Sequence, residues 1–219
     1  MATVQTFFAN LKNRILEVYE NTIAGFIRSI FSKPSSILFL GIDNAGKTTL
    51  LHKLKEDVTN TYEPTHHPMN SEIEIGNMKA NIMDLGGHTS ARLAWQEFFY
   101  NCDGIVFIVD VNDTKRYCLV QEVYQSVREI QVGKKKPPIA VLMNKIDLIK
   151  HDSNSILQNQ DVMDQIQKET GIENDDSMEQ PVLVTYVSLL NESITDMSSP
   201  ILQSFQWLDK MIHRRPEEL

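Results

Sequence analysis

One stretch organises the whole sequence: Gly41-Ile42-Asp43-Asn44-Ala45-Gly46-Lys47-Thr48. It matches G-x-x-x-x-G-K-[ST], the pattern of a loop whose backbone N–H groups cradle phosphates. Residues 37–40 before it form a short apolar run typical of a buried strand, and residues 49–54 after it have helical apolar spacing. The loop therefore precedes a helix N-terminus, where unpaired N–H groups and the helix dipole attract anions. We expect Gly46 to admit a phosphate closely, Lys47 to reach the outer phosphates and Thr48 to offer its hydroxyl to Mg²⁺.

Length and charge limit the remaining possibilities. At 219 residues, the chain suits one α/β domain with an extension. The formal net charge of −8 gives no case for nucleic-acid binding. Residues 1–33 are nevertheless basic and apolar ahead of an acidic body, which indicates a membrane surface or a partner. The two cysteines, Cys102 and Cys118, predict no disulfide framework, fit a reducing compartment and are expected to fill the core.

Residues 1–33 carry apolar side chains at helical spacing, which predicts one or two amphipathic helices ended by Pro34. Two interpretations remain open: a helix packed on the domain's own core, or a helix lying in a lipid interface. The basic residues and the bulky apolar side chains favour the second. No apolar run suits a transmembrane helix, and no signal peptide is expected. Ala2 excludes N-myristoylation, and no prenylation box ends the sequence.

From residue 37 onward, strand patterns alternate with helix patterns. This predicts a doubly wound α/β fold with a mostly parallel six-stranded sheet and helices on both faces. The boundaries we expect are an N-terminal segment 1–33, a domain 34–213 and a tail 214–219. Strands are expected at 37–40, 71–75, 78–85, 105–110, 139–143 and 182–187, with a turn at 76–77. Helices are expected at 49–54, 91–101, 117–130, 161–170 and 200–212.

Two stretches after the phosphate loop suggest a nucleotide-dependent switch. Thr65 lies in a polar loop, where a threonine can coordinate Mg²⁺ and sense a γ-phosphate. Asp84-Leu85-Gly86-Gly87-His88 contains D-x-x-G at the end of a predicted strand. Asp84 would hold Mg²⁺ through water, Gly87 would offer its N–H to the γ-phosphate, and His88 would lie beside the attacking water. D-x-x-G alone is a weak signal, but its position one hairpin after a phosphate loop makes it strong.

A third stretch, Asn144-Lys145-Ile146-Asp147, is the purine-reading signature N-K-x-D. A carboxylate accepts hydrogen bonds from both N1–H and the 2-amino group of guanine, whereas adenine leaves it unpaired at a high cost. The Lys145 stem would cover the base face. A backbone N–H of Ser188 or Leu189 could donate to guanine O6. These motifs together predict GTP/GDP binding and phosphoryl transfer to water.

The same residues carry a family resemblance. Residues 41–51 resemble the Arf/Sar branch of Ras-like small GTPases, and Pro64-Thr65-His66-His67-Pro68 with residues 84–88 resembles the Sar family. Arf proteins usually have Gln where His88 stands and Gly where Ala2 stands. The resemblance runs from about residue 37 to residue 147 and is fainter beyond.

Sar proteins initiate the COPII coat at the endoplasmic reticulum, and the resemblance implies the same cycle here. A membrane-bound exchange factor loads GTP, the hairpin around residues 76–77 shifts register, and the N-terminal helix enters the bilayer. The GTP form then recruits the inner coat, whose activating subunit inserts an arginine finger while His88 helps place the water. The protein would be cytoplasmic and peripheral on the cytosolic face of the endoplasmic reticulum membrane.

The resemblance also assigns site residues, position by position. The catalytic set would be Lys47, Thr65 and His88. The Mg²⁺ set would be Asp43, Thr48, Thr65 and Asp84. The nucleotide set would be Asn44, Ala45, Gly46, Lys47, Thr48, Thr49, Gly87, Asn144, Lys145, Asp147, Ser188 and Leu189.

The chain departs from the family pattern in four places. The N-terminal segment is longer, Ser188-Leu189 replaces the usual Ser-Val, residues 150–181 do not resemble the family's insert, and a tail follows Ile212. Two alternatives therefore stay open. One is an Arf-like GTPase acting at another membrane, and the other is a GTP-gated scaffold that scarcely hydrolyses its nucleotide.

Overall fold

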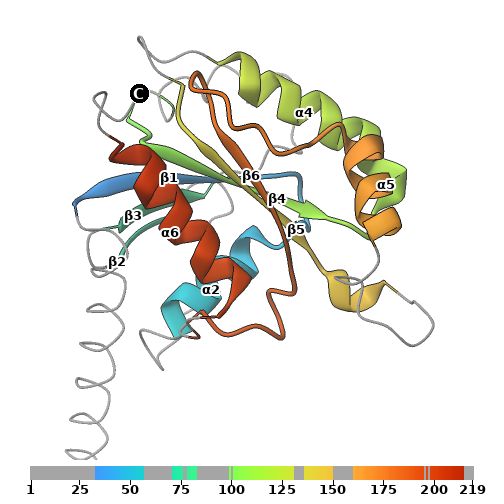
Figure 1. Ribbon diagram of the computed structural model, residues 1–219. Helices are drawn as coiled ribbons and strands as arrows, with labels where there is room; N and C mark the ends of the chain where they lie inside the picture. Colours follow the sequence, from blue (N-terminus) through green and yellow to red (C-terminus); the bar gives the residue numbers. More distant parts are fainter. Residues whose placement is uncertain are drawn as a thin grey trace, which may run out of the picture.

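A single six-stranded sheet forms the centre of the computed structural model, which describes residues 33–56, 71–75, 78–82, 99, 101–130, 136–149, 160–194, 196 and 198–214. The strand order is β2-β3-β1-β4-β5-β6 (Figure 1). All neighbours are parallel except β2 and β3, which pair antiparallel. The mostly parallel sheet predicted from the sequence is thus confirmed. The strands are β1 (Ser35–Leu40), β2 (Ser71–Ile75), β3 (Met78–Ile82), β4 (Gly104–Asp110), β5 (Ile139–Asn144) and β6 (Val182–Val187).

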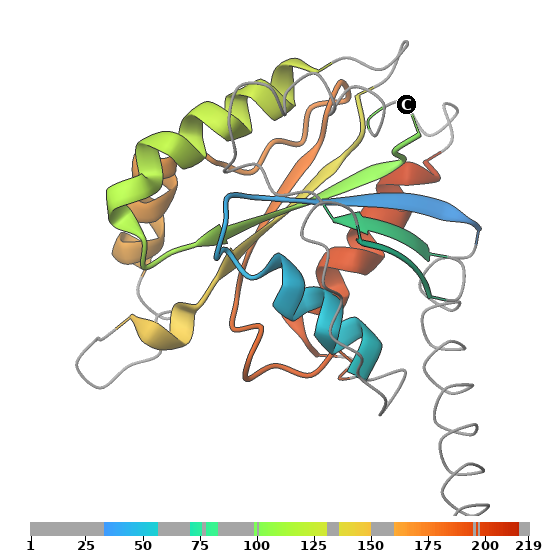
Figure 2. The same cartoon turned by 180° about the vertical axis from the view of Figure 1, so that it is seen from behind.

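Helices cover both faces of the sheet, as expected for a doubly wound fold (Figures 1 and 2). Two helices, α2 (Lys47–Glu56) and α6 (Pro200–Ile212), pack into one apolar core. The other two, α4 (Tyr117–Glu129) and α5 (Gln160–Thr170), pack into the core on the opposite face. Two short 3₁₀ helices, η1 (Thr114–Arg116) and η2 (Ile146–Leu148), follow β4 and β5. Of the helices in the described ranges, none has the length and apolar character needed to cross a membrane.

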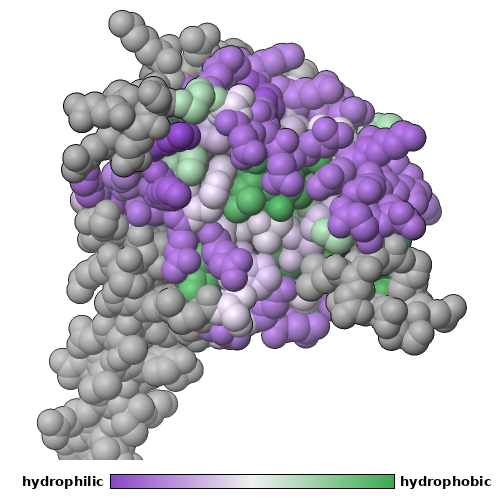
Figure 3. All heavy atoms as spheres, viewed as in Figure 1, coloured by the Kyte–Doolittle hydropathy of each residue, from purple (hydrophilic) through white to green (hydrophobic). Residues whose placement is uncertain are grey.

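The two cores follow from the period of two along each strand. In β1, Ile37 and Phe39 belong to the core under α2 and α6, whereas Leu38 and Leu40 belong to the core under α4 and α5. Strands β4 and β5 are buried along their whole length, as expected of central parallel strands. On the coloured part of the face drawn in Figure 3, hydrophilic side chains predominate, and the largest group of apolar side chains lies near the middle.

The predicted helices at 117–130, 161–170 and 200–212 and the strand at 182–187 are confirmed to within one residue. Several other expectations fall outside the described residues: the N-terminal helix, the loop containing Thr65, the 76–77 turn, residues 83–90 and nearly all of the helix at 91–101.

The two cysteines differ, and one expectation was wrong. Cys102 packs against the core, and burial raises the pKa of its thiol to about 12. Cys118, expected in the core, is exposed on α4. On that helix, Tyr117, Val120 and Val123 face the sheet. Position 118 therefore points to solvent, because residues three and four apart share a helical face.

Because all the strands except β2 run parallel to one another, their carboxyl ends meet at one edge of the sheet. The phosphate loop follows β1, residue 111 follows β4, Lys145 follows β5 and Ser188 follows β6. In open α/β sheets, ligands bind in the crevice outside these carboxyl ends. The topology therefore gathers motifs that lie far apart in the sequence.

Candidate functional site

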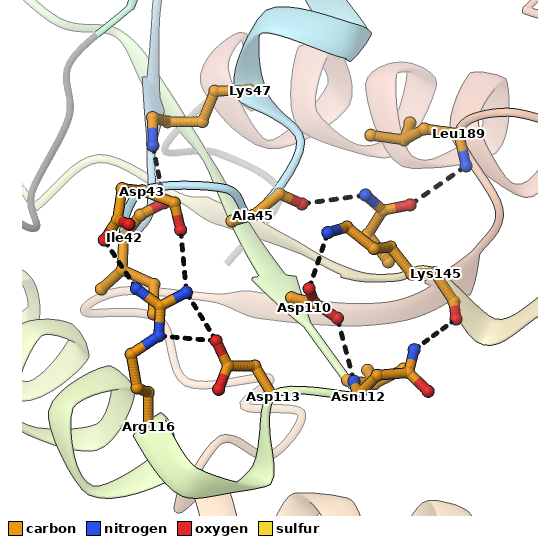
Figure 4. Close-up of polar contacts among 12 residues, drawn as sticks. Ile42, Asp43, Ala45, Lys47, Asp110, Asn112, Asp113, Arg116, Lys145 and Leu189 are labelled. Atoms are coloured by element: carbon orange, nitrogen blue, oxygen red, sulfur yellow. Dashed lines mark hydrogen bonds and ion pairs between the residues drawn. The ribbon is translucent and has the colours of Figure 1, made fainter. Parts of the chain in front are cut away.

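The phosphate loop joins β1 to α2, and its backbone carbonyls bind the side chain of Lys47. The first backbone bond of the helix runs from the N–H of Leu50 to the carbonyl of Gly46, at 2.9 Å. The Lys47 ammonium donates to the carbonyls of Gly41 and Ile42 at 2.9 and 2.7 Å, and only 4% of this residue is exposed. Figure 4 shows Lys47 reaching back across the loop to Ile42. The loop thus holds a buried cation beside a helix N-terminus, which suits a phosphate anion.

Two glycines allow the loop to adopt this path. Gly41 and Gly46 have φ of +145° and +115°, values that side chains on L-residues rarely adopt. A Cβ on Gly41 would collide with the carbonyl of Ile108 in β4. A Cβ on Gly46 would collide with the side-chain amide of Asn144. Gly46 therefore makes room for the N-K-x-D segment, a role that the sequence pattern does not reveal.

Asn144 connects the two parts of the site. It is the last residue of β5, and only 3% of it is exposed. Its Nδ2 donates to the carbonyl of Ala45 at 2.9 Å, and its Oδ1 accepts from the N–H of Leu189 at 3.1 Å (Figure 4). One side chain therefore holds the phosphate loop and the turn after β6 in register. The sequence assigned Asn144, Ala45 and Leu189 to the nucleotide. In the structure the three residues lie together, because Asn144 forms hydrogen bonds with both Ala45 and Leu189.

Asp147 receives its own support from the turn after β6. The hydroxyl of Ser188 donates to Asp147 Oδ1 at 2.5 Å. This bond fixes the orientation of an exposed carboxylate that would otherwise rotate freely. The N–H groups expected to meet guanine O6 are engaged within the protein: Ser188 donates to Glu192 Oε1 at 2.8 Å, and Leu189 donates to Asn144. Glu192 was not among the predicted site residues, because no motif includes it.

Lys145 stands in the left-handed region, with φ of 69°. Its ammonium pairs with Asp110 Oδ2 at 2.7 Å, at the end of β4. Its carbonyl accepts from the side-chain amide of Asn112 at 2.7 Å, and the N–H of Asn112 donates to Asp110 Oδ1 at 2.9 Å. These contacts hold the strained segment between β5 and η2. Neither Asp110 nor Asn112 was among the predicted site residues, although a carboxylate that ends a wholly apolar strand is a usable signal.

Asp43, predicted as a Mg²⁺ ligand, lies in an ion pair. Its Oδ1 is 2.7 Å from Arg116 Nη1, and its carbonyl accepts from Nη2 at 3.3 Å (Figure 4). The same guanidinium donates through Nε to Asp113 Oδ2 at 2.5 Å, and this bond, chiefly, raises the pKa of Arg116. Arg116 thereby ties the phosphate loop to η1. The i, i+3 spacing of Asp113 and Arg116 after a strand end was the signal available in the sequence.

The donor set fits Mg²⁺ as far as the described residues extend. Thr48 follows Lys47 in the first turn of α2 and is exposed, so its hydroxyl is available to a ligand. Hydroxyl and carboxylate oxygens are the hard donors that Mg²⁺ prefers. The other expected ligands and switch residues, Thr65, Asp84, Gly87 and His88, lie outside the described residues.

A glycine-bearing phosphate loop and an N-K-x-D segment at the carboxyl edge of a parallel sheet define a guanine-nucleotide-binding protein of the small-GTPase class. The profile of the ADP-ribosylation factor family matches residues 23–210. The chain therefore belongs to this family of GTP-hydrolysing switches.

Relatives within the family refine this assignment. The chain is 48% identical to the small COPII coat GTPase SAR1 of Encephalitozoon cuniculi, over 95% of this chain and 94% of that protein. A crystal structure of that organism's SAR1 in complex with GDP superposes with a TM-score of 0.75 and covers 95% and 93% of the two chains. The ADP-ribosylation factor of the same organism is 30% identical over 87% of this chain. The larger identity places the chain in the Sar branch, and the similarity extends well beyond residues 37–147.

Proposed function

We propose that this protein is the switch that starts COPII coat assembly at the endoplasmic reticulum. In the GTP-loaded form it inserts its N-terminal segment into the membrane and recruits the inner coat. The observation that carries this proposal is the 48% identity to a small COPII coat GTPase over 95% of the chain. An Arf-like role at another membrane receives less support, because identity to an ADP-ribosylation factor is 30%.

The described contacts suggest how the nucleotide would be held. Residues 44–49 would hold the phosphates, with the buried Lys47 ammonium offsetting their charge. Asp147, oriented by Ser188, would accept from N1–H and the 2-amino group of guanine. Asn144 would keep the phosphate and base subsites at a constant separation, because it bonds to both loops. Lys145, with its ammonium anchored on Asp110, would present its aliphatic stem to the base.

Hydrolysis would require the residues that complete the site on its γ-phosphate side. Thr65, Asp84 and Gly87 would respond to the γ-phosphate, and His88 would orient the attacking water. The proposed Mg²⁺ ligands are Asp43, Thr48, Thr65 and Asp84. To bind the ion, Asp43 would leave its ion pair with Arg116. Mg²⁺, when bound, would neutralise charge on the phosphate oxygens.

The proposed output is membrane attachment through residues 1–33, ahead of a GTPase domain at 34–213 and a tail at 214–219. Fully burying one Phe or Ile side chain gains about 1.5–3 kcal/mol, so several suffice for reversible attachment. The expected partners are bilayer lipid, a guanine exchange factor and the inner coat with its activating subunit. The expected location is the cytosolic face of the endoplasmic reticulum membrane.

Liposome recruitment tests this proposal. The full chain is loaded with GDP or a non-hydrolysable GTP analogue, mixed with liposomes and purified inner coat, and floated. We expect coat and protein to float together only with the GTP analogue. Recruitment that is equal with both nucleotides, or coat that stays behind while the protein floats, would contradict the proposal. A variant without residues 1–33, checked for GDP binding, should not float.

A second measurement addresses His88. Single-turnover GTP hydrolysis is followed with and without the inner coat. The coat is expected to stimulate the wild-type chain strongly, since an arginine finger adds about 10³–10⁵ in rate. The variant His88→Gly is expected to lose this stimulation. Equal stimulation in both would exclude the role proposed for His88.

A further inference from the structure

A lysine on the phosphate helix reaches the turn that carries the base-side residues. Lys53 lies in α2, the helix that begins with Lys47. Its ammonium donates to the carbonyl of Leu189 at 2.7 Å and to that of Leu190 at 3.3 Å. Leu189 and Leu190 follow Lys53 in the chain by 136 and 137 positions. This contact lies outside all the motifs, and it links the helix behind the phosphates to the turn beside the base.

Glu192 holds the same turn from within it. Its Oε1 accepts the N–H of Ser188 at 2.8 Å, and its own N–H donates to the carbonyl of Ser188 at 3.0 Å. Its second oxygen, Oε2, is buried and has no hydrogen-bond partner in the described part of the chain. Burial raises the pKa of this carboxyl, and the charge of Lys53 acts in the opposite direction. A carboxylate oxygen that is buried without a hydrogen-bond partner destabilises a fold, so its position calls for an explanation.

We infer that Lys53 and Glu192 are positioning residues for guanine recognition and control the rate of nucleotide release. The inference rests on the guanine site proposed above. Ser188 is the link, because Glu192 holds its N–H while its hydroxyl holds the carboxylate of Asp147. Lys53 holds the carbonyls that follow. A displacement of α2 at the phosphate end would therefore loosen the grip of Asp147 on the base.

A purely structural role would have a different signature. General softening of the fold weakens the binding of every nucleotide by a similar factor. Loosening of Asp147 instead weakens the contact with the 2-amino group, which inosine nucleotides lack. GDP affinity would then fall more than IDP affinity, and the preference for GDP over IDP would shrink.

The experiment measures release rates and dissociation constants of GDP and IDP on the full chain. The variants are Lys53→Ala, Lys53→Arg and, as the matched control, Lys210→Ala, which removes an exposed lysine from α6. In Lys53→Ala we expect GDP release roughly tenfold faster, the scale of one lost charge-assisted hydrogen bond, and a smaller GDP-over-IDP preference. Lys53→Arg, which can still donate to both carbonyls, is expected to restore most of the preference.

Glu192 provides the second, independent arm. Glu192→Gln keeps an acceptor for the Ser188 N–H and is expected to stay within about threefold of wild type, whereas Glu192→Ala should resemble Lys53→Ala. Equal losses for GDP and IDP, or Lys53→Ala behaving like Lys210→Ala, would overturn the inference. A wild-type chain that binds neither GDP nor GTP would instead overturn the proposed function.

Discussion

The side-chain amide of Asn144 lies 2.9 Å from the carbonyl oxygen of Ala45, although the two residues are 99 positions apart in the chain. The oxygen of the same amide, Oδ1, accepts a hydrogen bond from the N–H of Leu189, which lies 45 positions further along the chain. One buried side chain thus holds both the phosphate loop after β1 and the turn after β6. Both partners are main-chain groups, so the contact depends on the fold rather than on the identity of the partner residues.

Replacing Asn144 by Ala is expected to destabilise the protein substantially. The substitution leaves the Ala45 carbonyl and the Leu189 N–H without their partner, and each unsatisfied buried group costs about 1–3 kcal/mol. We expect a loss of about 2–5 kcal/mol in the free energy of unfolding by urea at a fixed nucleotide concentration. Asn112→Ala, which removes a single exposed hydrogen bond, is the control and is expected to cost less than about 1.5 kcal/mol. Equal losses would contradict the coupling role.

Two glycines with positive φ should respond differently to the same substitution. Gly46→Ala would bring a Cβ onto the Asn144 amide, whereas Gly171→Ala would meet only the flexible end of Gln121. We expect Gly171→Ala to cost about 1 kcal/mol from backbone strain, and Gly46→Ala to cost at least twice as much and also to weaken GDP binding. Thermal unfolding and GDP titration of both variants provide the measurement. GDP binding that falls equally in the two would show that strain, not the contact with Asn144, is responsible.

The two thiols are expected to react at very different rates. Cys118 is exposed, whereas burial raises the pKa of Cys102 to about 12. Because the thiolate is the reactive form, a chromogenic disulfide reagent at pH 8 should modify one thiol quickly in the native chain and the second only after unfolding. The fast phase should disappear in Cys118→Ala. A fast phase that persists in that variant would show that Cys102 is accessible.

The ion pair between Arg128 and Asp175 predicts a pH dependence of stability. The hydrogen bond from Arg128, 2.7 Å from the carboxylate, lowers the pKa of Asp175 below its ordinary value. A lowered folded-state pKa means that the stabilisation is complete above the unfolded-state pKa, near 4, and is lost as the pH falls through the folded-state pKa.

Urea unfolding of the wild type should therefore show a loss of stability as the pH falls below about 4, and Asp175→Asn should reduce that loss. Because the pair is partly exposed, the effect at neutral pH is small. Asp176→Asn at the exposed neighbouring position is the control. An acid-induced loss that is the same in wild type and Asp175→Asn would argue against the pair.

Much of the fold could be predicted because its signals are local. Strand β6 and helices α4, α5 and α6 were expected within one residue of their observed bounds, since apolar periods of two and 3.6 lie within a single segment. The position of Cys118 was predicted wrongly, because composition says that cysteines are often buried but not which face of α4 meets the sheet.

The motifs of the candidate site could be predicted from the sequence, but the contacts that join them could not. The phosphate loop and N-K-x-D were identified from spacing, because backbone geometry at each requires those residue types. Arg116, Lys53 and Glu192 carry no motif. Arg116 and Lys53 became visible through partners on other loops: Arg116 bonds to a carboxylate 73 positions away, and Lys53 bonds to carbonyls more than 130 positions away. Glu192 became visible through its contact with Ser188 in the turn after β6.

The sequence by itself therefore determined the class of protein and the ligand, because phosphate and guanine recognition depend on short runs of fixed residue type. The tertiary structure decided how the two subsites are joined. Parallel strands bring their carboxyl ends to one edge of the sheet, and there Asn144 and Lys53 connect loops that the chain places far apart. Such contacts depend on strand order and register, and no local pattern in the sequence contains that information.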